Sequence, residues 1–258
     1  MDRRTLLKLI GFGALETTFA VSFPSLVSAA TGQDVHWGYI GESGSDNWGN
    51  LSQEFQLCKT GIQQSPINLH GAITSDLSPI EIDYKESPLR IVNNGHTIQV
   101  NYAKGSSIKL DGQTFNLVQF HFHDPSEHTI EQKPFDMELH LVHRNEAGAL
   151  AVIGVLLKQG QHNAALQPIW DAFPTRNEPE QVVKTVKVNA EQLLPLERKV
   201  YRYFGSLTTP PCSQGVNWIV MQQPIELSQD QIQRFADLIS IDARPLQPLN
   251  NRFVLRSS

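Results

Sequence analysis

The chain has 258 residues, of which 40% are hydrophobic and 18% are charged, and its formal net charge is −5. This composition is typical of a globular protein and excludes a disordered chain, a collagen and a coiled coil. The mild acidity argues against a nucleic-acid partner, which would favour a basic surface. No apolar run approaches the roughly 20 residues that a membrane-spanning helix needs.

Residues 1–29 are predicted to be an export signal rather than part of the fold. Arg3 and Arg4 form a charged start, a moderately apolar stretch follows, and the segment ends at Ala29 in a small-residue cleavage site. The paired arginines resemble a twin-arginine signal, with an ordinary secretory leader as the alternative. Both predict an exported protein, periplasmic or extracellular, whose mature domain covers residues 30–258.

Cysteine usage agrees with export. Cys58 and Cys212 are the only two cysteines, and two cysteines far apart in an exported chain favour one disulfide. Two unpaired, buried thiols are the alternative.

Predicted strands dominate the mature chain, which has no linker and no internal repeat and is therefore expected to form one domain. The strands are rich in Val, Ile, Leu and Phe and are bounded by turn residues such as Asp111-Gly112. In chain order they cover Ile80–Asp83, Thr97–Tyr102, Ser107–Leu110, Phe115–His123, Met137–His143, Leu150–Lys158 and Val216–Gln222.

Two helices are expected, over residues 163–172 and 228–239. The second begins with a capping box formed by Ser228 and Gln231. Its apolar face consists of Ile232, Phe235, Leu238 and Ile239. Many strands and few short helices predict a mainly β fold.

The first of two histidine-bearing strands carries a His-x-His pair. Nine histidines occur in the chain, and five of them fall between residues 121 and 143. Because side chains alternate along a strand, Gln119, His121 and His123 share one face. Phe120 and Phe122 then point the other way, into an apolar core.

The second strand carries His140 on the same face as Glu138 and Val142, opposite His143. If the two strands are neighbours, His140 lies beside the pair formed by His121 and His123. Three imidazoles then converge on one point.

Three neutral imidazoles without a thiolate favour a catalytic zinc site. Structural zinc sites are closed by four protein ligands, usually including cysteines, whereas three histidines leave one position for water. Zinc lowers the pKa of that water to about 7, which makes hydroxide available at neutral pH. The other ring nitrogens need acceptors, and Gln119 and Glu138 each lie two residues before a histidine on the same face.

A rival motif overlaps this segment. His121, His123 and Glu127 also match the first metal motif of cupins, in which a glutamate joins three histidines around iron or manganese. Cupins usually place glycines around that run, where this chain has Phe115 and Pro134. The second cupin motif is also missing, so this interpretation is weaker.

Further stretches extend the pattern along the chain. They are His36-Trp37-Gly38-Tyr39, Gln64-Ser65-Pro66-Ile67-Asn68-Leu69, Asn93-Asn94-Gly95-His96, QFHFH at 119–123, SEHT at 126–129, ELHLVH at 138–143, GSLTTPPC at 205–212, and Trp218. In this order they are highly specific, and from about His36 to Arg256 the chain resembles the α-class carbonic anhydrases. The resemblance implies one domain around a large, twisted, mostly antiparallel β-sheet. It also implies Zn²⁺-dependent, reversible hydration of carbon dioxide to bicarbonate and a proton.

The resemblance implies a role for each matching residue. His121, His123 and His140 correspond to the zinc ligands, and Gln119 and Glu138 to the acceptors behind them. In this family, zinc-bound hydroxide attacks carbon dioxide and a histidine then passes a proton to buffer. The expected partner is this small-molecule substrate, carbon dioxide or bicarbonate, and protein partners stay open.

Three more residues match the catalytic positions. Thr208 corresponds to the threonine that orients the hydroxide, and Glu127 to the acceptor behind that threonine. His96 corresponds to the proton shuttle, a task that suits a group with a pKa near 6.5.

The remaining matches surround the substrate. The apolar wall where carbon dioxide sits corresponds to Val142, Val152, Leu207 and Trp218, and Thr209 borders that pocket. The water side is lined by the residues that match Tyr39, Asn94 and Gln99. Away from the substrate, the disulfide of extracellular members corresponds to Cys58 and Cys212.

Two stretches depart from the animal members of the family. Asp124-Pro125 replaces Trp-Gly after the ligands, and Asp242-Ala243-Arg244-Pro245 stands in place of Asn-Trp-Arg-Pro. Neither carries an assigned role, so both bear on local packing rather than on activity. A non-catalytic extracellular binding module is the remaining alternative; loss of a ligand histidine would favour it, and none is lost.

Overall fold

The computed structural model describes residues 35–175 and 178–258. The expected export signal, residues 1–29, lies outside the described residues. Among the residues described, no helix is both long and apolar enough to cross a membrane.

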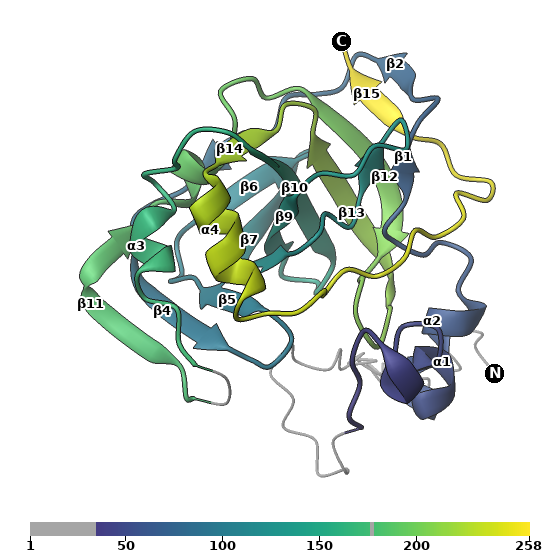
Figure 1. Ribbon diagram of the computed structural model, residues 1–258. Helices are drawn as coiled ribbons and strands as arrows, with labels where there is room; N and C mark the ends of the chain where they lie inside the picture. Colours follow the sequence, from purple (N-terminus) through teal and green to yellow (C-terminus); the bar gives the residue numbers. More distant parts are fainter. Residues whose placement is uncertain (1–34, 176–177) are drawn as a thin grey trace, which may run out of the picture. The chain divides into compact units, whose positions relative to one another are not determined.

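Thirteen of the described strands form one large, twisted sheet (Figure 1). Its main path contains, in spatial order, β11 (Gln181–Val188), β4 (Ser87–Asn93), β5 (Ile98–Asn101), β7 (Gln113–His123), β9 (Met137–Arg144), β10 (Leu150–Gln159), β13 (Gln214–Met221), β12 (Val200–Ser206), β15 (Leu255–Ser257) and β2 (Ile73–Ser75). Off this path, β3 (Glu81–Asp83) pairs with β6 (Ser107–Leu110), β6 also pairs with β7, and β14 (Ile225–Leu227) pairs with β10.

Most neighbouring strands are antiparallel, as expected. The exceptions within this sheet are β13 and β14, which pair in parallel with β10, and β2, which pairs in parallel with β15. A separate parallel pair joins β1 (Asn68–Leu69) to β8 (Thr129–Ile130). The single, mainly β domain is thus confirmed, with a sheet that is mixed rather than uniform.

Every predicted strand overlaps an observed one, but eight of the described strands were not predicted: β1, β2, β4, β8, β11, β12, β14 and β15. The residues of β11 are mostly exposed or half-buried, so the strand has no buried apolar face that a sequence pattern could indicate. In β4 the signal was present, because Leu89 and Ile91 are buried on either side of the exposed Arg90.

The helices are short. They are η1 (Gly41–Ser43), α1 (Trp48–Leu51), η2 (Gln53–Phe55), α2 (Leu57–Thr60), α3 (Gln167–Trp170), η3 (Ala190–Leu193) and α4 (Gln229–Ala236). The predicted capping box of Ser228 and Gln231 begins α4. The helix expected over 163–172 is shorter, because the side chain of Asn163 accepts the N–H groups of Ala165 and Leu166 in place of a helical turn.

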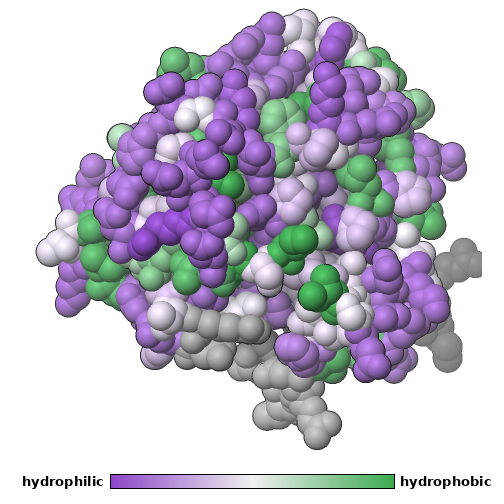
Figure 2. Space-filling view, viewed as in Figure 1, coloured by the Kyte–Doolittle hydropathy of each residue, from purple (hydrophilic) through white to green (hydrophobic). Residues whose placement is uncertain are grey.

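Two apolar clusters lie on opposite faces of the central strands. Leu139 and Leu141 belong to one cluster with Phe120 and Phe122, whereas Val142 belongs to the other. This alternation confirms the predicted division of faces. The outer surface in the view of Figure 2 is mostly hydrophilic, with apolar side chains in small groups.

Candidate metal centre

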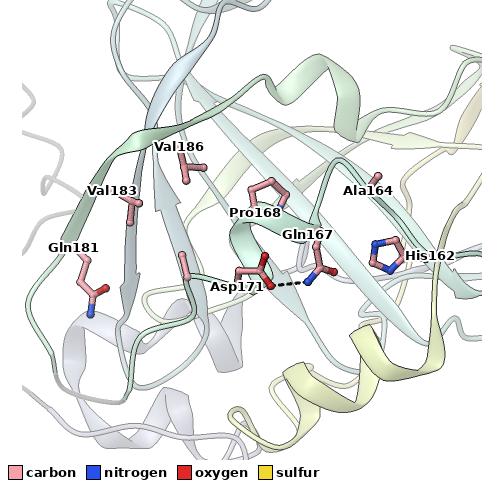
Figure 3. A pocket seen from close by; sticks show the side chains of 9 residues that line it. His162, Ala164, Gln167, Pro168, Asp171, Gln181, Val183 and Val186 are labelled. Atoms are coloured by element: carbon pink, nitrogen blue, oxygen red, sulfur yellow. Dashed lines mark hydrogen bonds between the residues drawn. The ribbon is translucent and has the colours of Figure 1, made fainter.

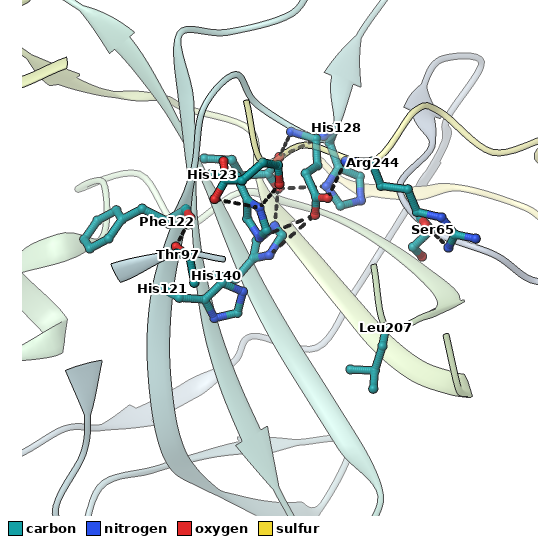
Figure 4. A network of polar contacts seen from close by, with 12 residues as sticks. Ser65, Thr97, His121, Phe122, His123, His128, His140, Leu207 and Arg244 are labelled. Atoms are coloured by element: carbon teal, nitrogen blue, oxygen red, sulfur yellow. Dashed lines mark hydrogen bonds and ion pairs between the residues drawn. The ribbon is translucent and has the colours of Figure 1, made fainter. Parts of the chain in front are cut away.

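The pairing of β7 with β9 brings the predicted histidines together. His121 lies directly opposite His140 in this antiparallel register, and His123 follows two residues later on the same face. The ring centroids of His123 and His140 are 4.6 Å apart, and those of His121 and His140 are 5.3 Å apart. One nitrogen of each ring lies within 4.8 Å of the other two, and Figure 4 shows the rings side by side.

Two of these imidazoles donate hydrogen bonds to the residues predicted from strand alternation. Nδ1 of His121 donates to Oε1 of Gln119 at 2.9 Å, and Nε2 of His140 donates to Oε1 of Glu138 at 2.9 Å. Both acceptors lie on the same strand as the histidine that they orient.

The third imidazole has an acceptor that was not predicted. Nδ1 of His123 donates to the backbone oxygen of Asp242 at 2.8 Å. The pattern of side chains along the sequence cannot predict a hydrogen bond to a backbone oxygen, and Asp242 is 119 residues away from His123 in the chain.

The donor set fits a zinc ion. Amide, carboxylate and carbonyl oxygens can only accept, so each histidine carries its proton on the nitrogen already used, and the other nitrogen keeps a lone pair. Nε2 of His123 is buried and has no hydrogen-bond partner among the described residues. Burial lowers the pKa of His121 and His140, which favours the neutral form that binds metal. Three neighbouring imidazoles without a thiolate could hold a metal ion, and this is the ligand type that catalytic zinc sites use.

A second group of possible ligands is already used in hydrogen bonds. His128, Glu138 and His140 also lie close enough to share an ion. However, Nδ1 of His128 donates to Oε1 of Glu138 at 2.7 Å, the oxygen that also accepts from His140. Burial alone would raise the pKa of the Glu138 carboxyl, but the two imidazoles hold it well below its usual range.

His128 was missed by the sequence reasoning, although it extends the network around Glu138. Its Nε2 lies 2.7 Å from the Tyr203 hydroxyl, which in turn lies 2.8 Å from Oγ of Ser65. His128 lies outside the strands, so strand alternation could not reveal it; only its place in the SEHT stretch pointed to it.

Glu127 lies beside the histidines, but its expected contact is not made. Its Oε1 accepts the backbone N–H of Arg244 at 2.9 Å. Its Oε2 lies 3.6 Å from Nε2 of His123 and 3.9 Å from Nδ1 of His140. That oxygen has no hydrogen-bond partner within the described part of the chain, so the buried Thr208 does not donate to it.

His96 lies at one side of a cavity of about 230 Å³. Its ring stacks on Trp37, with centroids 3.7 Å apart and planes 3° apart. Tyr39, Asp242 and His36 line the same cavity. Burial, reinforced by the carboxylates of Glu127 and Asp242, raises the pKa of Tyr39 well above its usual range, which keeps its hydroxyl protonated.

Two residues expected on the water side hold the local structure. Oδ1 of Asn94 accepts the N–H groups of His96 and Thr97 at 3.0 and 2.9 Å, which fixes the turn before β5. Gln99 lies opposite His121 in the sheet, and its amide donates to Asn101 at 2.7 Å.

The expected apolar wall forms one row across three strands. Val152 is paired with Val142 on one side and with Trp218 on the other, and all three are at most 4% exposed. The Trp218 ring lies 4.9 Å from the His140 ring, so the wall adjoins the candidate ligands. Leu207 packs against the same cluster, and Thr209 follows two residues later, half-buried.

The predicted disulfide between Cys58 and Cys212 is present. Its loop also carries Thr209, whose backbone oxygen accepts the N–H of Cys212 at 2.9 Å. The disulfide therefore ties α2 to the segment that follows Thr208.

A cavity of about 560 Å³ lies elsewhere, between α3 and β11 (Figure 3). Its lining includes His162, Pro168 and Val186, and the side chain of Gln167 donates to Asp171 across its floor at 2.6 Å. None of the residues predicted for the site lines it.

Comparison with known proteins agrees with this geometry. The family model described as eukaryotic-type carbonic anhydrase matches residues 43–258. A carbonic anhydrase of Nostoc sp. is 45% identical over 99% of this chain and 97% of its own length, and one of Pectobacterium carotovorum is 43% identical over 88% and 93%.

Solved structures give the same result. The α-carbonic anhydrase of Thermovibrio ammonificans, in complex with the inhibitor sulfanilamide, is 42% identical with a TM-score of 0.83, over 86% of this chain and 99% of that one. The chain is thus an enzyme of the carbonic anhydrases and belongs to their eukaryotic-type, or alpha, family.

Proposed function

We propose that this chain catalyses the reversible hydration of carbon dioxide to bicarbonate and a proton, with Zn²⁺ held by His121, His123 and His140. The observation that carries the proposal is the set of three neighbouring imidazoles, two buried and one half-buried, each held by an acceptor on one ring nitrogen so that the other nitrogen is left for a metal. When bound there, zinc would lower the pKa of a coordinated water to about 7 and so supply a nucleophile at neutral pH.

The apolar wall and its polar neighbours would bind and orient the substrate. Carbon dioxide is apolar, so the buried row of Val142, Val152 and Trp218 suits it. Leu207 and Thr209 would border this pocket. Thr208 would accept a hydrogen bond from the attacking oxygen. Its own hydroxyl makes no bond to Glu127 in the described structure, and it would have to turn toward the unpartnered Oε2 of Glu127 to donate to it.

His96 would carry the released proton to buffer. It lies at a cavity rather than among the buried ligands, and its imidazole is suited to proton exchange near neutral pH. Tyr39, Asn94 and Gln99 would hold the water through which the proton passes.

The protein is proposed to be exported, with residues 1–29 as its signal and residues 30–258 as the mature enzyme. The disulfide between Cys58 and Cys212 supports this, because such bonds persist in oxidising compartments.

Stopped-flow measurement of carbon dioxide hydration, with metal analysis of the same sample, tests the proposal. We expect one zinc per chain and fast hydration that is lost on chelation. His140→Ala should lose most of the zinc and most of the activity, whereas the exposed His70→Ala should lose neither. Zinc without hydration would favour a binding module that kept the site, and iron or manganese without hydration would revive the cupin interpretation.

A further inference from the structure

The three candidate ligands are oriented by acceptors of two kinds, two on strands and one in a loop. Gln119 and Glu138 lie on β7 and β9, on the same strands as the histidines that they orient. His123 instead relies on the backbone oxygen of Asp242, which lies in residues 240–249, a stretch without helix or strand. An imidazole held by a loop oxygen is oriented only as well as that loop is fixed.

The side chain of Asp242 fixes its own loop to the end of β7. Its Oδ1 accepts the backbone N–H of Asp124 at 2.7 Å, and its backbone N–H donates to the Asp124 oxygen at 3.1 Å. Asp124 directly follows His123. Three hydrogen bonds therefore join Asp242 to two consecutive residues, one of which is a candidate ligand.

Within the described residues, the Asp242 carboxyl accepts no other hydrogen bond. It is 1% exposed, and its Oδ2, which lies 3.7 Å from Nδ1 of His123, has no hydrogen-bond partner in residues 35–175 and 178–258. Burying an oxygen without a hydrogen-bond partner is unfavourable. The hydrogen bond that Oδ1 accepts from the Asp124 N–H therefore has to offset the free energy lost at Oδ2. Asp124 and Asp242 are also the places where the sequence departs from animal members, and the structure brings these two departures into contact.

We propose that Asp242 is a positioning residue for His123: its carboxyl clamps the loop to Asp124, and the clamped loop oxygen orients the imidazole toward the metal. This inference rests on the zinc site of the proposed function.

The first test is the rate at which zinc leaves the loaded protein in excess chelator. Asp242→Ala removes the acceptor for the Asp124 N–H and should release zinc about 10-fold faster or more. Asp242→Asn keeps an acceptor oxygen at the same place and should stay close to the parent rate. Ser106→Ala is the matched control, because Ser106 is 2% exposed and its Oγ also accepts a backbone N–H, that of Lys85, at 2.9 Å.

The second test does not depend on zinc. Hydrogen exchange followed by NMR should find the Asp124 amide strongly protected in the parent and in Asp242→Asn. If Asp242→Ala does not fold, this measurement on the other two proteins still decides the matter.

Three results would overturn the inference: parent-like zinc release from Asp242→Ala, equally fast release from both variants, or rapid exchange of the Asp124 amide in the parent. A parent protein that binds no zinc would instead contradict the proposed function. The exchange measurement would then still test the clamp.

Discussion

His96 is held by an aromatic ring rather than by the metal centre. It stacks on Trp37 with the ring planes 3° apart, at a cavity that His36 also lines. Asp242, whose backbone oxygen accepts from the candidate ligand His123, lines the same cavity, which is the basis for proposing His96 as the proton shuttle.

Replacement of His96 tests the proton shuttle. In weak buffer, His96→Ala should lower the turnover number for carbon dioxide hydration by about 10-fold or more, because proton release then depends on water. Added imidazole should restore part of the rate. His36→Ala is the control from the same cavity and should keep the parent rate. An unchanged rate in His96→Ala would rule out this role.

A second histidine makes stability depend on pH. His143 is fully buried beside Tyr84, with 2.7 Å between its Nε2 and the hydroxyl. Burial lowers the pKa of His143 to about 4. The unfolded chain, with a histidine pKa near 6.5, therefore takes up this proton first as pH falls.

The free energy of unfolding should accordingly fall between about pH 6.5 and pH 4, by about 3 kcal/mol from this group. The stabilisation from neutral, buried His143 is fully present above the pKa that histidine has in the unfolded chain. Urea denaturation at a series of pH values measures it. The double variant Tyr84→Phe/His143→Leu replaces both partners by apolar groups and should show a flatter profile; a profile as steep as the parent's would contradict the assignment.

At the residue scale, strand alternation predicted what lies on strands. Gln119 and Glu138 were identified because they share a face and a strand with a histidine. The oxygen of Asp242 and the ring of His128 were not, because one is a backbone atom and both lie in loops. The contact between Thr208 and Glu127 was expected from resemblance alone, and the described structure does not contain it.

At the scale of elements, β7, β9 and β10 build the site by packing closely. Gly154 on β10 lies opposite His140 on β9. A Cβ added to Gly154 would lie 2.9 Å from Oε1 of Glu138, closer than a carbon and an oxygen can approach. The absence of a side chain at this position therefore leaves room for the carboxylate that orients His140.

Gly154→Ala should displace Glu138 and lower the free energy of unfolding by about 1–3 kcal/mol. It should also speed zinc release, because His140 loses its acceptor. Chemical denaturation and zinc transfer to a chelator measure the two effects. Gly38→Ala, whose added carbon would meet only Ser43 Oγ at 3.4 Å, is the matched control. Parent-like values for both measurements in Gly154→Ala would contradict this account.

The strands were predictable where buried and exposed residues alternate along them, or where nearly all of their residues are buried. β6 was predicted with its observed bounds, and β9 and β10 each within one residue. β11 was missed because it lies at the sheet edge with mostly exposed residues. The order of the strands across the sheet depends on contacts between distant segments, and it entered the prediction only through the resemblance.

At the scale of the whole molecule, the disulfide joins segments 154 residues apart. Hydrogen bonds reinforce the same junction: Arg244 donates to the Cys58 oxygen at 3.0 Å and to Gln64 at 2.9 Å, and Gln64 donates to the Cys212 oxygen at 3.1 Å. The backbone N–H of Arg244 also holds Glu127. The junction therefore reaches from α2 to the edge of the candidate metal centre.

Reduction of this disulfide should destabilise the protein by about 2–5 kcal/mol, because the unfolded chain regains the freedom that the long covalent loop removes. The melting temperature with and without reductant measures the effect. The double variant Cys58→Ser/Cys212→Ser should melt at the temperature of the reduced parent and should not respond to reductant, which separates loss of the bond from other effects of the reagent. Because Thr208 lies close to the bonded Cys212 in the chain, hydration activity should fall at temperatures below the melting transition of the reduced protein. Two free thiols in the exported protein, found by mass spectrometry, would contradict the role of this bond.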